Sequence, residues 1–324
     1  MTVDIDRPPV RTAVGLGAIC ALTAALALGS PGFVHRPLMQ LWTTTFVAIC
    51  IQAMPFLVLG VTVGGLIAAM LPDGLLARLL PRSPLFSVPA AALAGAVLPG
   101  CECSSVPIAG RLVDGGAPAP AALAFLLAAP AINPVVLVAT SVAFPGQPKV
   151  VLARFVASLA AAVVVAWIWS RVDGQPLRTR AHDHDHAAEM PSRLARFFAA
   201  AQHDLLHAGG FLVVGAALAA TLQTVVPRTI LDRVAGSGAG AVVAMAVLAV
   251  AVAVCSEADA FVAASLGQFS LTARLAFMVV GPMVDVKLVA MQAGTFGRRF
   301  ALRFAPLTLV VAAGSAALVG RWLL

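Results

Sequence analysis

Long uncharged apolar runs alternate with short polar connections along almost the whole chain. A transmembrane helix needs about 20 apolar residues to cross the hydrocarbon core of a bilayer, and most of the runs reach that length. Several runs are interrupted by proline, glycine or single polar residues, as broken helices in membrane proteins are. The pattern therefore predicts an all-α polytopic membrane protein with about eight to ten transmembrane helices. Long uncharged runs span residues 12–34, 37–72, 115–148, 205–227, 234–256 and 304–320.

Composition supports a membrane location. Of the 324 residues, 60% are hydrophobic and only 11% are charged, whereas about a quarter of the residues in a soluble domain are charged. The net charge of +7 does not indicate a nucleic-acid partner, because the arginines are scattered between apolar runs, as loop charges are. Among these loop charges we count Arg78, Arg82, Lys149 and Arg154, which favour a cytoplasmic N-terminus, whereas Arg111 and Arg274 weaken that count. The five cysteines lie in or beside apolar segments and do not indicate a disulfide scaffold.

The distribution of polar residues divides the chain into four segments. They are residues 1–36 with a first transmembrane helix, residues 37–171 as a first membrane repeat, residues 172–204 as an aqueous linker, and residues 205–324 as a second repeat. In the linker, His182, His184 and His186 alternate with aspartates and share one face of an extended chain, where imidazoles suit Zn or Cu. A solvated loop of mixed charge is the alternative, and we favour it.

The second repeat reproduces the order of short motifs in the first. The corresponding pairs are residues 56–60 with 211–215, 101–103 with 255–257, 130–133 with 282–285, and 152–155 with 301–304. Duplicated halves with hydrophobic segments interrupted at corresponding positions usually indicate a transporter whose site lies at the bilayer midplane. We therefore expect two pseudo-symmetric repeats with broken helices, either parallel or inverted.

The first candidate element is Cys101-Glu102-Cys103, at the end of an apolar run. A Pro-Gly pair before it and Pro107 after it argue against a regular helix there. In a broken segment, two thiolates and a carboxylate converge on one ligand, and thiolates suit soft species such as Cu(I), Zn(II) or a trivalent arsenical. The alternative is that both cysteines only pack where helices cross.

Cys255, Glu257 and Asp259 form the corresponding element of the second repeat, with no basic residue nearby in the sequence. A lone carboxylate in hydrocarbon costs at least about 2.5 kcal/mol, so each acid is expected to face a polar cavity or to carry a proton. Acids of this kind exchange protons for substrate in a proton-coupled carrier. An interfacial loop in which both acids are simply hydrated is the alternative.

Asn133, Asp285 and Lys287 lie where Asn-Pro and Gly-Pro steps break the helical pattern. Such breaks free backbone carbonyls, which a membrane tolerates only beside protein or water. We expect Asn133 and Lys287 to shape the polar site, and Asp285 to exchange a proton or to balance charge. A structural salt bridge between the halves, made by Lys287 and a buried acid, is equally consistent with the sequence.

Motifs of soluble enzymes and of ATP-driven transport are absent from the sequence, which has no Walker loop, no His-Glu-x-x-His and no Gly-x-Ser-x-Gly. We therefore expect no enzymatic activity and no cofactor. A membrane-embedded enzyme that uses the paired carboxylates as acid and base is the less favoured alternative, because we find neither a nucleophile nor a metal triad for it.

Four longer motifs stand out: Pro-Gly-Cys-Glu-Cys-Ser-Ser-Val-Pro (99–107), Ala-Phe-Leu-Leu-Ala-Ala-Pro-Ala-Ile-Asn-Pro (124–134), Cys-Ser-Glu-Ala-Asp-Ala-Phe-Val-Ala-Ala-Ser (255–265) and Gly-Pro-Met-Val-Asp-Val-Lys-Leu (281–288). Together they resemble the predicted-permease family that includes the organoarsenical efflux permeases, over roughly residues 40–322. The resemblance implies a multi-spanning inner-membrane carrier, and some members export trivalent organoarsenicals or are linked to soft-metal efflux. In the family the first motif often reads Cys-x-Cys-Gly, and here Ser104 stands in place of that glycine.

We accordingly expect a multi-pass permease of the cell (inner or plasma) membrane that exports a soft or thiophilic solute by proton-coupled alternating access. Its partners are then the lipid bilayer and a small-molecule or metal-ion substrate, without nucleic acid. A permease for an unrelated small metabolite or ion, in which the cysteines only pack, is the alternative. The residues expected at the substrate site are Cys101, Glu102, Cys103, Asn133, Cys255, Glu257, Asp259, Asp285 and Lys287.

Overall fold

The computed structural model describes residues 37–70, 83–97, 101–172, 193–225 and 238–324, and every regular element within these ranges is an α-helix. The predicted all-α class is therefore confirmed. The helix expected within residues 1–36 lies outside the described residues, as do His182, His184 and His186 of the predicted linker. The first helix and the metal-binding interpretation of the histidines stay predictions.

The described helices are α3 (Pro37–Met70), α5 (Pro84–Gly95), α6 (Glu102–Asp114), α7 (Ala119–Ile132), α8 (Pro134–Ala143), α9 (Pro148–Val172), α10 (Arg193–Val225), α12 (Gly238–Val252), α13 (Asp259–Ser265), α14 (Leu271–Val280), α15 (Val286–Thr295) and α16 (Arg298–Leu323). Within these ranges, five stretches are long and apolar enough to cross a membrane: Leu38–Leu66, Ala119–Ala143, Pro148–Val172, Phe197–Thr221 and Arg298–Leu323. α5, α12 and α14 are apolar but shorter. The chain is therefore a multi-pass membrane protein.

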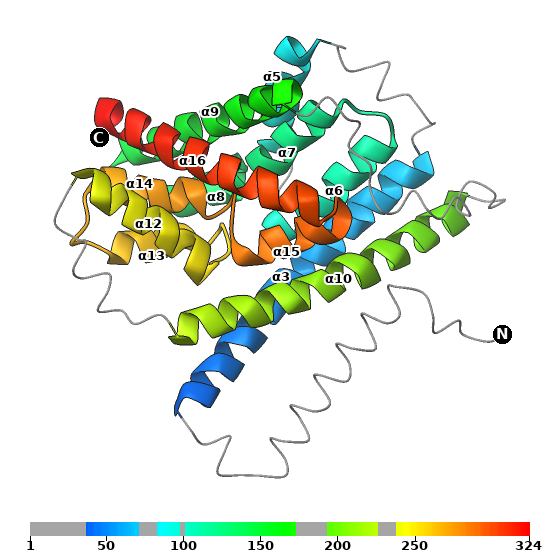
Figure 1. The fold of residues 1–324 in the computed structure, drawn as a ribbon, viewed down its shortest axis with the longest axis horizontal. Coiled ribbons are helices and arrows are strands. Elements are labelled where there is room, and N and C mark those ends of the chain that lie inside the picture. Colours follow the sequence, from blue (N-terminus) through cyan, green and yellow to red (C-terminus); the bar gives the residue numbers. More distant parts are fainter. Residues whose placement is uncertain (1–36, 71–82, 98–100, 173–192, 226–237) are drawn as a thin grey trace.

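Two helices form the centre of the molecule. Residues Ala121–Ile132 of α7 and Leu275–Val280 of α14 are all buried. α9 and α16 pack against each other and against these central helices, whereas α3 (blue) and α10 (yellow-green) lie side by side (Figure 1). The long outer helices carry exposed leucines and valines, as helices that are apolar all round do when they meet lipid.

The two sets of helices that follow the repeated motifs make corresponding contacts. α5 packs on α7 as α12 packs on α14, and α7 packs on α9 as α14 packs on α16. Contacts between the sets correspond as well, because α6 packs on α15 while α13 packs on α8. α10 begins at Arg193, inside the segment predicted as a linker. The division of the chain into four segments stays a prediction.

The helices break at the two positions where the repeated motifs place an Asn or an Asp. Asn133 separates α7 from α8, and its Oδ1 accepts a hydrogen bond of 2.9 Å from the backbone N–H of Val136. Asp285 precedes α15, and its Oδ1 accepts a hydrogen bond of 2.6 Å from the N–H of Leu288. Each side chain thus caps the helix that follows it by satisfying an N–H left without an intrahelical partner. The broken helices were predicted, and these caps give their local cause.

The first candidate element departs from the expected irregular segment. α6 begins at Glu102 and continues through Pro107, which is buried within the helix. The expectation that Pro107 would prevent a regular helix was wrong, because a helix tolerates one missing N–H when tertiary packing supports it. The absent N–H means that residue 107 cannot donate to the carbonyl of Cys103. Cys101 lies outside the helix, with an extended backbone (φ −87°, ψ 179°).

Two corresponding glycines bring long helices close to the elements that carry polar residues. A Cβ at Gly60 of α3 would lie 2.6 Å from the Cα of Ser104 in α6. A Cβ at Gly215 of α10 would lie 2.6 Å from the Cα of Lys287 in α15. Small residues allow such close backbone approach in membrane helices. α6 and α15 are thereby held tightly against the α3–α10 pair.

Candidate substrate site

A buried ion pair joins the N-terminal ends of α6 and α15. The Nζ of Lys287 lies 2.9 Å from Oε1 of Glu102 and 3.5 Å from Oδ2 of Asp285, and all three side chains are at most 3% exposed. The second oxygen of Glu102 accepts a hydrogen bond of 3.3 Å from Oγ of Ser256. Because a buried charge left alone costs several kcal/mol, this pair fixes α6 against α15, one helix from each predicted repeat.

Three thiols gather beside this ion pair. Because Cys101 precedes α6, helical spacing does not turn its side chain away from Cys103, and its thiol interacts with those of Cys103 and Cys255. The Sγ atoms of Cys101 and Cys255 and a carboxylate oxygen of Glu102 lie within 4.8 Å of one another. Two sulfurs and a carboxylate oxygen at this spacing form a donor set for a soft, thiophilic atom.

Glu257 approaches the thiols from the irregular segment between α12 and α13. Ala253, at the start of this segment, has a left-handed backbone (φ 48°), so α12 stops there. Further along, the thiol of Cys255 donates a hydrogen bond of 2.6 Å to Oε2 of Glu257. Glu257 is half-buried and, within the described part of the chain, has no cationic partner within 4.0 Å. It is therefore the acid of this group best placed to take up a proton or a cation.

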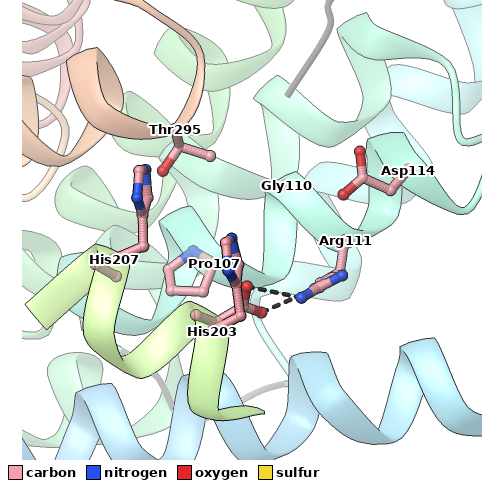
Figure 2. A pocket seen from close by; sticks show the side chains of 9 residues that line it. Pro107, Gly110, Arg111, Asp114, His203, His207 and Thr295 are labelled. Carbon is pink, nitrogen blue, oxygen red and sulfur yellow. Dashed lines mark hydrogen bonds and ion pairs between the residues drawn. The ribbon is translucent and has the colours of Figure 1, made fainter. Parts of the chain in front are cut away.

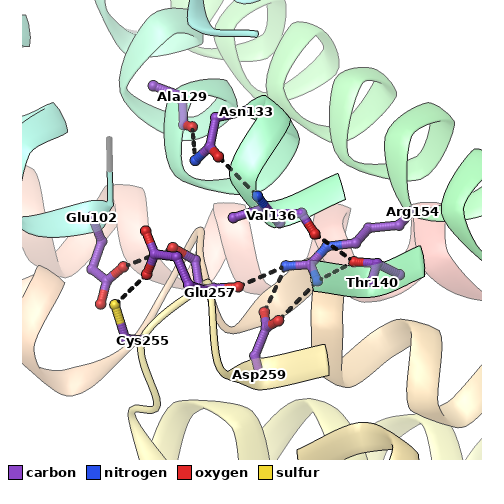
Figure 3. Close-up of polar contacts among 10 residues, drawn as sticks. Glu102, Ala129, Asn133, Val136, Thr140, Arg154, Cys255, Glu257 and Asp259 are labelled. Carbon is purple, nitrogen blue, oxygen red and sulfur yellow. Dashed lines mark hydrogen bonds and ion pairs between the residues drawn. The ribbon is translucent and has the colours of Figure 1, made fainter. Parts of the chain in front are cut away.

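Arg154 of α9 holds the same irregular segment from the other side (Figure 3). Its Nη1 and Nη2 donate to the two carboxylate oxygens of Asp259 at 2.8 and 2.7 Å. The guanidinium also donates to Oγ1 of Thr140 at 2.9 Å and to the carbonyl of Ser256 at 3.4 Å. Bidentate pairs of this kind are among the stronger polar interactions. Arg154 thus ties α8, α9 and α13 together behind the thiol-bearing segment.

The position of Arg154 corrects one interpretation of the sequence. The charge pattern places it among the loop charges, but it lies inside α9 and is 0% exposed. Its partner Asp259 is 105 residues away in the sequence, so local sequence does not reveal the pairing. Arg303, which occupies the corresponding motif of the second repeat, is exposed on α16. The two arginines therefore occupy corresponding motifs but differ in role, because Arg154 is buried in an ion pair and Arg303 is exposed.

A cavity of about 290 Å³ lies beside the ion pair and the thiols. α3 forms one wall, and the end of α12 with the irregular segment after it contributes to the rest. Small-molecule sites of proteins begin at about this volume and combine apolar walls with a few polar groups. The residues that line the cavity are Thr44, Thr45, Ala48, Ile49, Gln52, Ala53, Glu102, Val252, Ala253, Val254, Cys255 and Lys287.

A second cavity, of about 30 Å³, lies near the opposite ends of α6 and α15 (Figure 2). Its lining includes Arg111 of α6, Thr295 of α15, and His207 of α10. Arg111 donates to the two carboxylate oxygens of Asp204 at 2.8 and 2.7 Å. Nε2 of His207 lies 3.1 Å from the carbonyl oxygen of Gly294. The space suffices for about one water molecule, and these polar contacts join α10 to α6 and α15 beside it.

Most of the residues predicted for the site lie in one cluster around the ion pair. They are Cys101, Glu102, Cys103, Cys255, Glu257, Asp285 and Lys287. Asp259 is set apart by its pairing with Arg154. Asn133 donates to the carbonyl of Ala129 and caps α8, so both of these hydrogen bonds go to the backbone. Whether any of these residues binds substrate stays a prediction.

Sequence reasoning missed several residues that the structure places at the site. Ser256 stands between two predicted residues and binds Glu102, and Thr140 binds Arg154. Gln52, an amide in the middle of an uncharged run, lines the larger cavity. A polar residue within a membrane span usually has a function, and this signal could have singled out both Gln52 and Arg154.

The fold and this buried polar cluster are those of a multi-pass helical membrane protein with an internal site. Comparison with known families makes the assignment more specific: the chain belongs to the family described as "Predicted permease", whose model matches residues 38–320. The protein is therefore a member of a membrane-permease family, and this family is the one that the four motifs resembled.

Two relatives illustrate the relationship. The chain is 35% identical over 276 residues to the "UPF0718 protein YcgR" of Bacillus subtilis (strain 168), covering 83% of this chain and 94% of that protein. It is 31% identical over 265 residues to a "Putative two-component membrane permease complex subunit" of Streptococcus mutans serotype c, covering 80% of this chain and 88% of that protein. No solved structure shows a significant match.

Proposed function

We propose that the chain is a secondary transporter of the plasma membrane that exports a soft or thiophilic solute, such as a trivalent organoarsenical or a soft metal ion, by proton-coupled alternating access. The observation that carries the proposal is the cluster of thiols, acids and a lysine from both predicted repeats, beside a cavity of about 290 Å³. Membership of a permease family supports transport as the activity.

The placement of the thiols supports a thiophilic substrate. Cys101 and Cys255 come from different repeats, and their Sγ atoms lie within 4.8 Å of each other. A ligand bound to both sulfurs would link the two repeats and would be released when they move apart. Its affinity would therefore depend on the relative position of the repeats, which is the property that a ligand needs in order to shift a conformational equilibrium.

The two cavities support alternating access along α6 and α15. Lys287 lines the larger cavity and Thr295 the smaller one, and they lie about 12 Å apart along the axis of α15 at 1.5 Å per residue. The larger cavity is present in the described conformation, and at the other end Arg111 and Asp204 form an ion pair of 2.7 Å. We infer that transport opens the Arg111–Asp204 end and closes the larger cavity.

The balance of charge supports coupling to protons. Four acids and two bases meet in the cluster and the adjoining Arg154 pair: Glu102, Glu257, Asp259 and Asp285 with Arg154 and Lys287. Three of the acids have a cation within 4.0 Å, whereas Glu257 hydrogen-bonds a neutral thiol donor. Uncompensated charge at this depth is unfavourable. Glu257 is therefore the residue that we assign to proton exchange.

A partner subunit belongs to the same proposal. The Streptococcus mutans relative is named as a subunit of a two-component membrane permease complex, and we infer that this chain also acts with a second membrane subunit. If so, we expect the transport rate per copy of the chain to be lower in vesicles that contain the purified chain alone than in membranes of its native host. Equal rates in the two preparations would exclude the need for a partner.

Uptake of a trivalent phenylarsenical into everted membrane vesicles, with and without a proton gradient, tests the function. We expect uptake by the wild-type chain. In the Cys255→Ser variant the uptake rate should fall roughly tenfold or more, which corresponds to a loss of about 1.4 kcal/mol of binding free energy. In the Glu257→Gln variant uptake should no longer respond to the proton gradient. Cys50→Ser in α3 is the matched control, because Cys50 lies outside the cluster. Wild-type rates in both Cys255→Ser and Glu257→Gln would refute the assigned roles.

A further inference from the structure

A stripe of polar side chains on α3 faces the larger cavity. Thr45 and Gln52 both line it, and their spacing of about two helical turns places them on one face of the helix. Ala48 and Ile49 of the same face line it too. Glu102, Lys287 and Cys255 line the same cavity, so α3 contributes one side of the candidate site.

Gln52 stands at the midpoint of the candidate membrane span Leu38–Leu66. In the part of the chain that the structure describes, its amide makes no hydrogen bond. Thr43 and Thr62 of the same helix differ, because their hydroxyls donate to the backbone carbonyls of Met39 and Val58 at 2.7 Å. An unpaired amide in hydrocarbon is costly. Gln52 is exposed on α3 and lines the larger cavity together with Glu102 and Lys287, and we take this polar surrounding as the reason that an amide stands at this depth.

We propose that Gln52 and Thr45 form a second wall of the substrate site and hydrogen-bond a polar group of the substrate, which is a small molecule and not a bare ion. This inference rests on the proposed transport function. A cavity of about 290 Å³ is far larger than one ion needs, since a water molecule takes up about 30 Å³ of liquid. The amide and the hydroxyl each donate and accept hydrogen bonds. They suit a substrate that carries a hydroxyl, carbonyl or amide away from the group held by Cys255.

The selectivity between two probes tests this recognition. Everted vesicles are given a trivalent phenylarsenical with or without a para-hydroxyl group, and the ratio of their uptake rates is measured. We expect the hydroxyl-to-unsubstituted ratio to fall about fivefold to tenfold in Gln52→Leu and less in Thr45→Val, because one neutral hydrogen bond is lost. Thr43→Val and Thr62→Val are matched controls on α3 and should leave the ratio unchanged. An unchanged ratio in Gln52→Leu, or an equal fall in the controls, overturns the proposal.

Thiol labelling tests the wall independently of the substrate. Gln52→Cys and Ile51→Cys are treated in native membranes with a charged, membrane-impermeant methanethiosulfonate, and mass spectrometry follows the peptide that carries the new thiol. Ile51 is 69% exposed but does not line the cavity. A charged reagent is excluded from hydrocarbon. We therefore expect the thiol at residue 52 to react at least about tenfold faster than the thiol at residue 51. Equal rates overturn the wall assignment. Fast labelling at residue 52 with no uptake of either probe supports the wall and refutes the arsenical as substrate.

Discussion

Glu102 is the residue on which the polar contacts of the site converge. It binds Lys287 through one carboxylate oxygen and Ser256 through the other, and it lies beside the thiols of Cys101 and Cys255. Its place in the first turn of α6 is favourable for a negative charge, because the N-terminus of a helix carries partial positive charge. One side chain thus connects the two helices, the irregular segment and the cavity.

Removing Lys287 should expose how strongly the site depends on charge pairing. Lys287→Met leaves Glu102 buried without its cation, and we expect the free energy of unfolding to fall by roughly 3–5 kcal/mol. The double variant Glu102→Gln with Lys287→Met should be less destabilised than Lys287→Met alone, because only Asp285, and no longer both Glu102 and Asp285, is then buried without its cation. Thermal unfolding in detergent measures both. Lys149→Met, at an exposed position of α9, is the control, and a double variant less stable than Lys287→Met would contradict the pairing.

At the scale of elements, the irregular segment between α12 and α13 carries the reactive side chains, and Arg154 determines where it lies. The segment is not a continuous helix, because residues 253–255 have no regular structure and the three residues that follow form a turn in which the N–H groups of Ala258 and Asp259 donate to the carbonyl of Cys255 at 2.9 and 3.1 Å. Its end is held through Asp259, and its middle through the carbonyl of Ser256. We therefore regard Arg154 as a positioning residue for Cys255 and Glu257.

Arg154→Ala should destabilise the protein by roughly 3–5 kcal/mol, because Asp259 would stay buried without a partner. Arg154→Lys should recover only part of the loss, since an ammonium cannot reproduce the bidentate geometry. Arg303→Ala tests the corresponding motif of the second repeat, where the side chain is exposed on α16, and should change stability by less than about 0.5 kcal/mol. Equal losses of stability for Arg154→Ala and Arg303→Ala in a thermal unfolding assay would show that the Arg154–Asp259 pair contributes no more to stability than an exposed arginine does.

Local signals explain which elements the sequence could predict. The breaks at Asn133 and Asp285 were predictable because Asn-Pro and Gly-Pro steps act within a few residues. The continuation of α6 through Pro107 was not, because burial by surrounding helices overrides a local preference. The pairing of Arg154 with Asp259 also depends on tertiary structure, since neither residue has an ionic partner nearby in the sequence. For the candidate site, the sequence indicated the thiols, the acids and Lys287, which lie together in the structure, and it missed Arg154 and Ser256, which contact them.

At the scale of the whole molecule, α6 and α15 run from a larger cavity to a small one that polar contacts surround. Both helices begin at the ion pair of Glu102 and Lys287. Their other ends meet α10, where Arg111 binds Asp204. The small cavity is therefore the part of the molecule that has to open if solutes pass along these helices.

Breaking the Arg111–Asp204 pair should open the small cavity. In a Thr295→Cys background, we expect Asp204→Asn to raise the rate of labelling of residue 295 by a charged thiol reagent about tenfold, because one charge-assisted hydrogen-bond pair no longer holds the closed form. Exchange of the charges, with Arg111→Asp and Asp204→Arg together, should restore slow labelling. Peptide mass spectrometry gives the rates. Unchanged labelling in Asp204→Asn would mean that the pair is not a gate.

The most direct test of a shared thiol site is to ask which cysteines one arsenic atom can bridge. Phenylarsine oxide condenses with two thiols, forming two As–S bonds and releasing one water. Treated with one equivalent in its native membrane and then digested, the protein should give a peptide pair in which a single phenylarsenic joins Cys101 or Cys103 to Cys255, whose thiols lie together in the structure. A phenylarsenic found only on pairs from the same repeat, with Cys255 unmodified, would contradict a site shared between the two repeats.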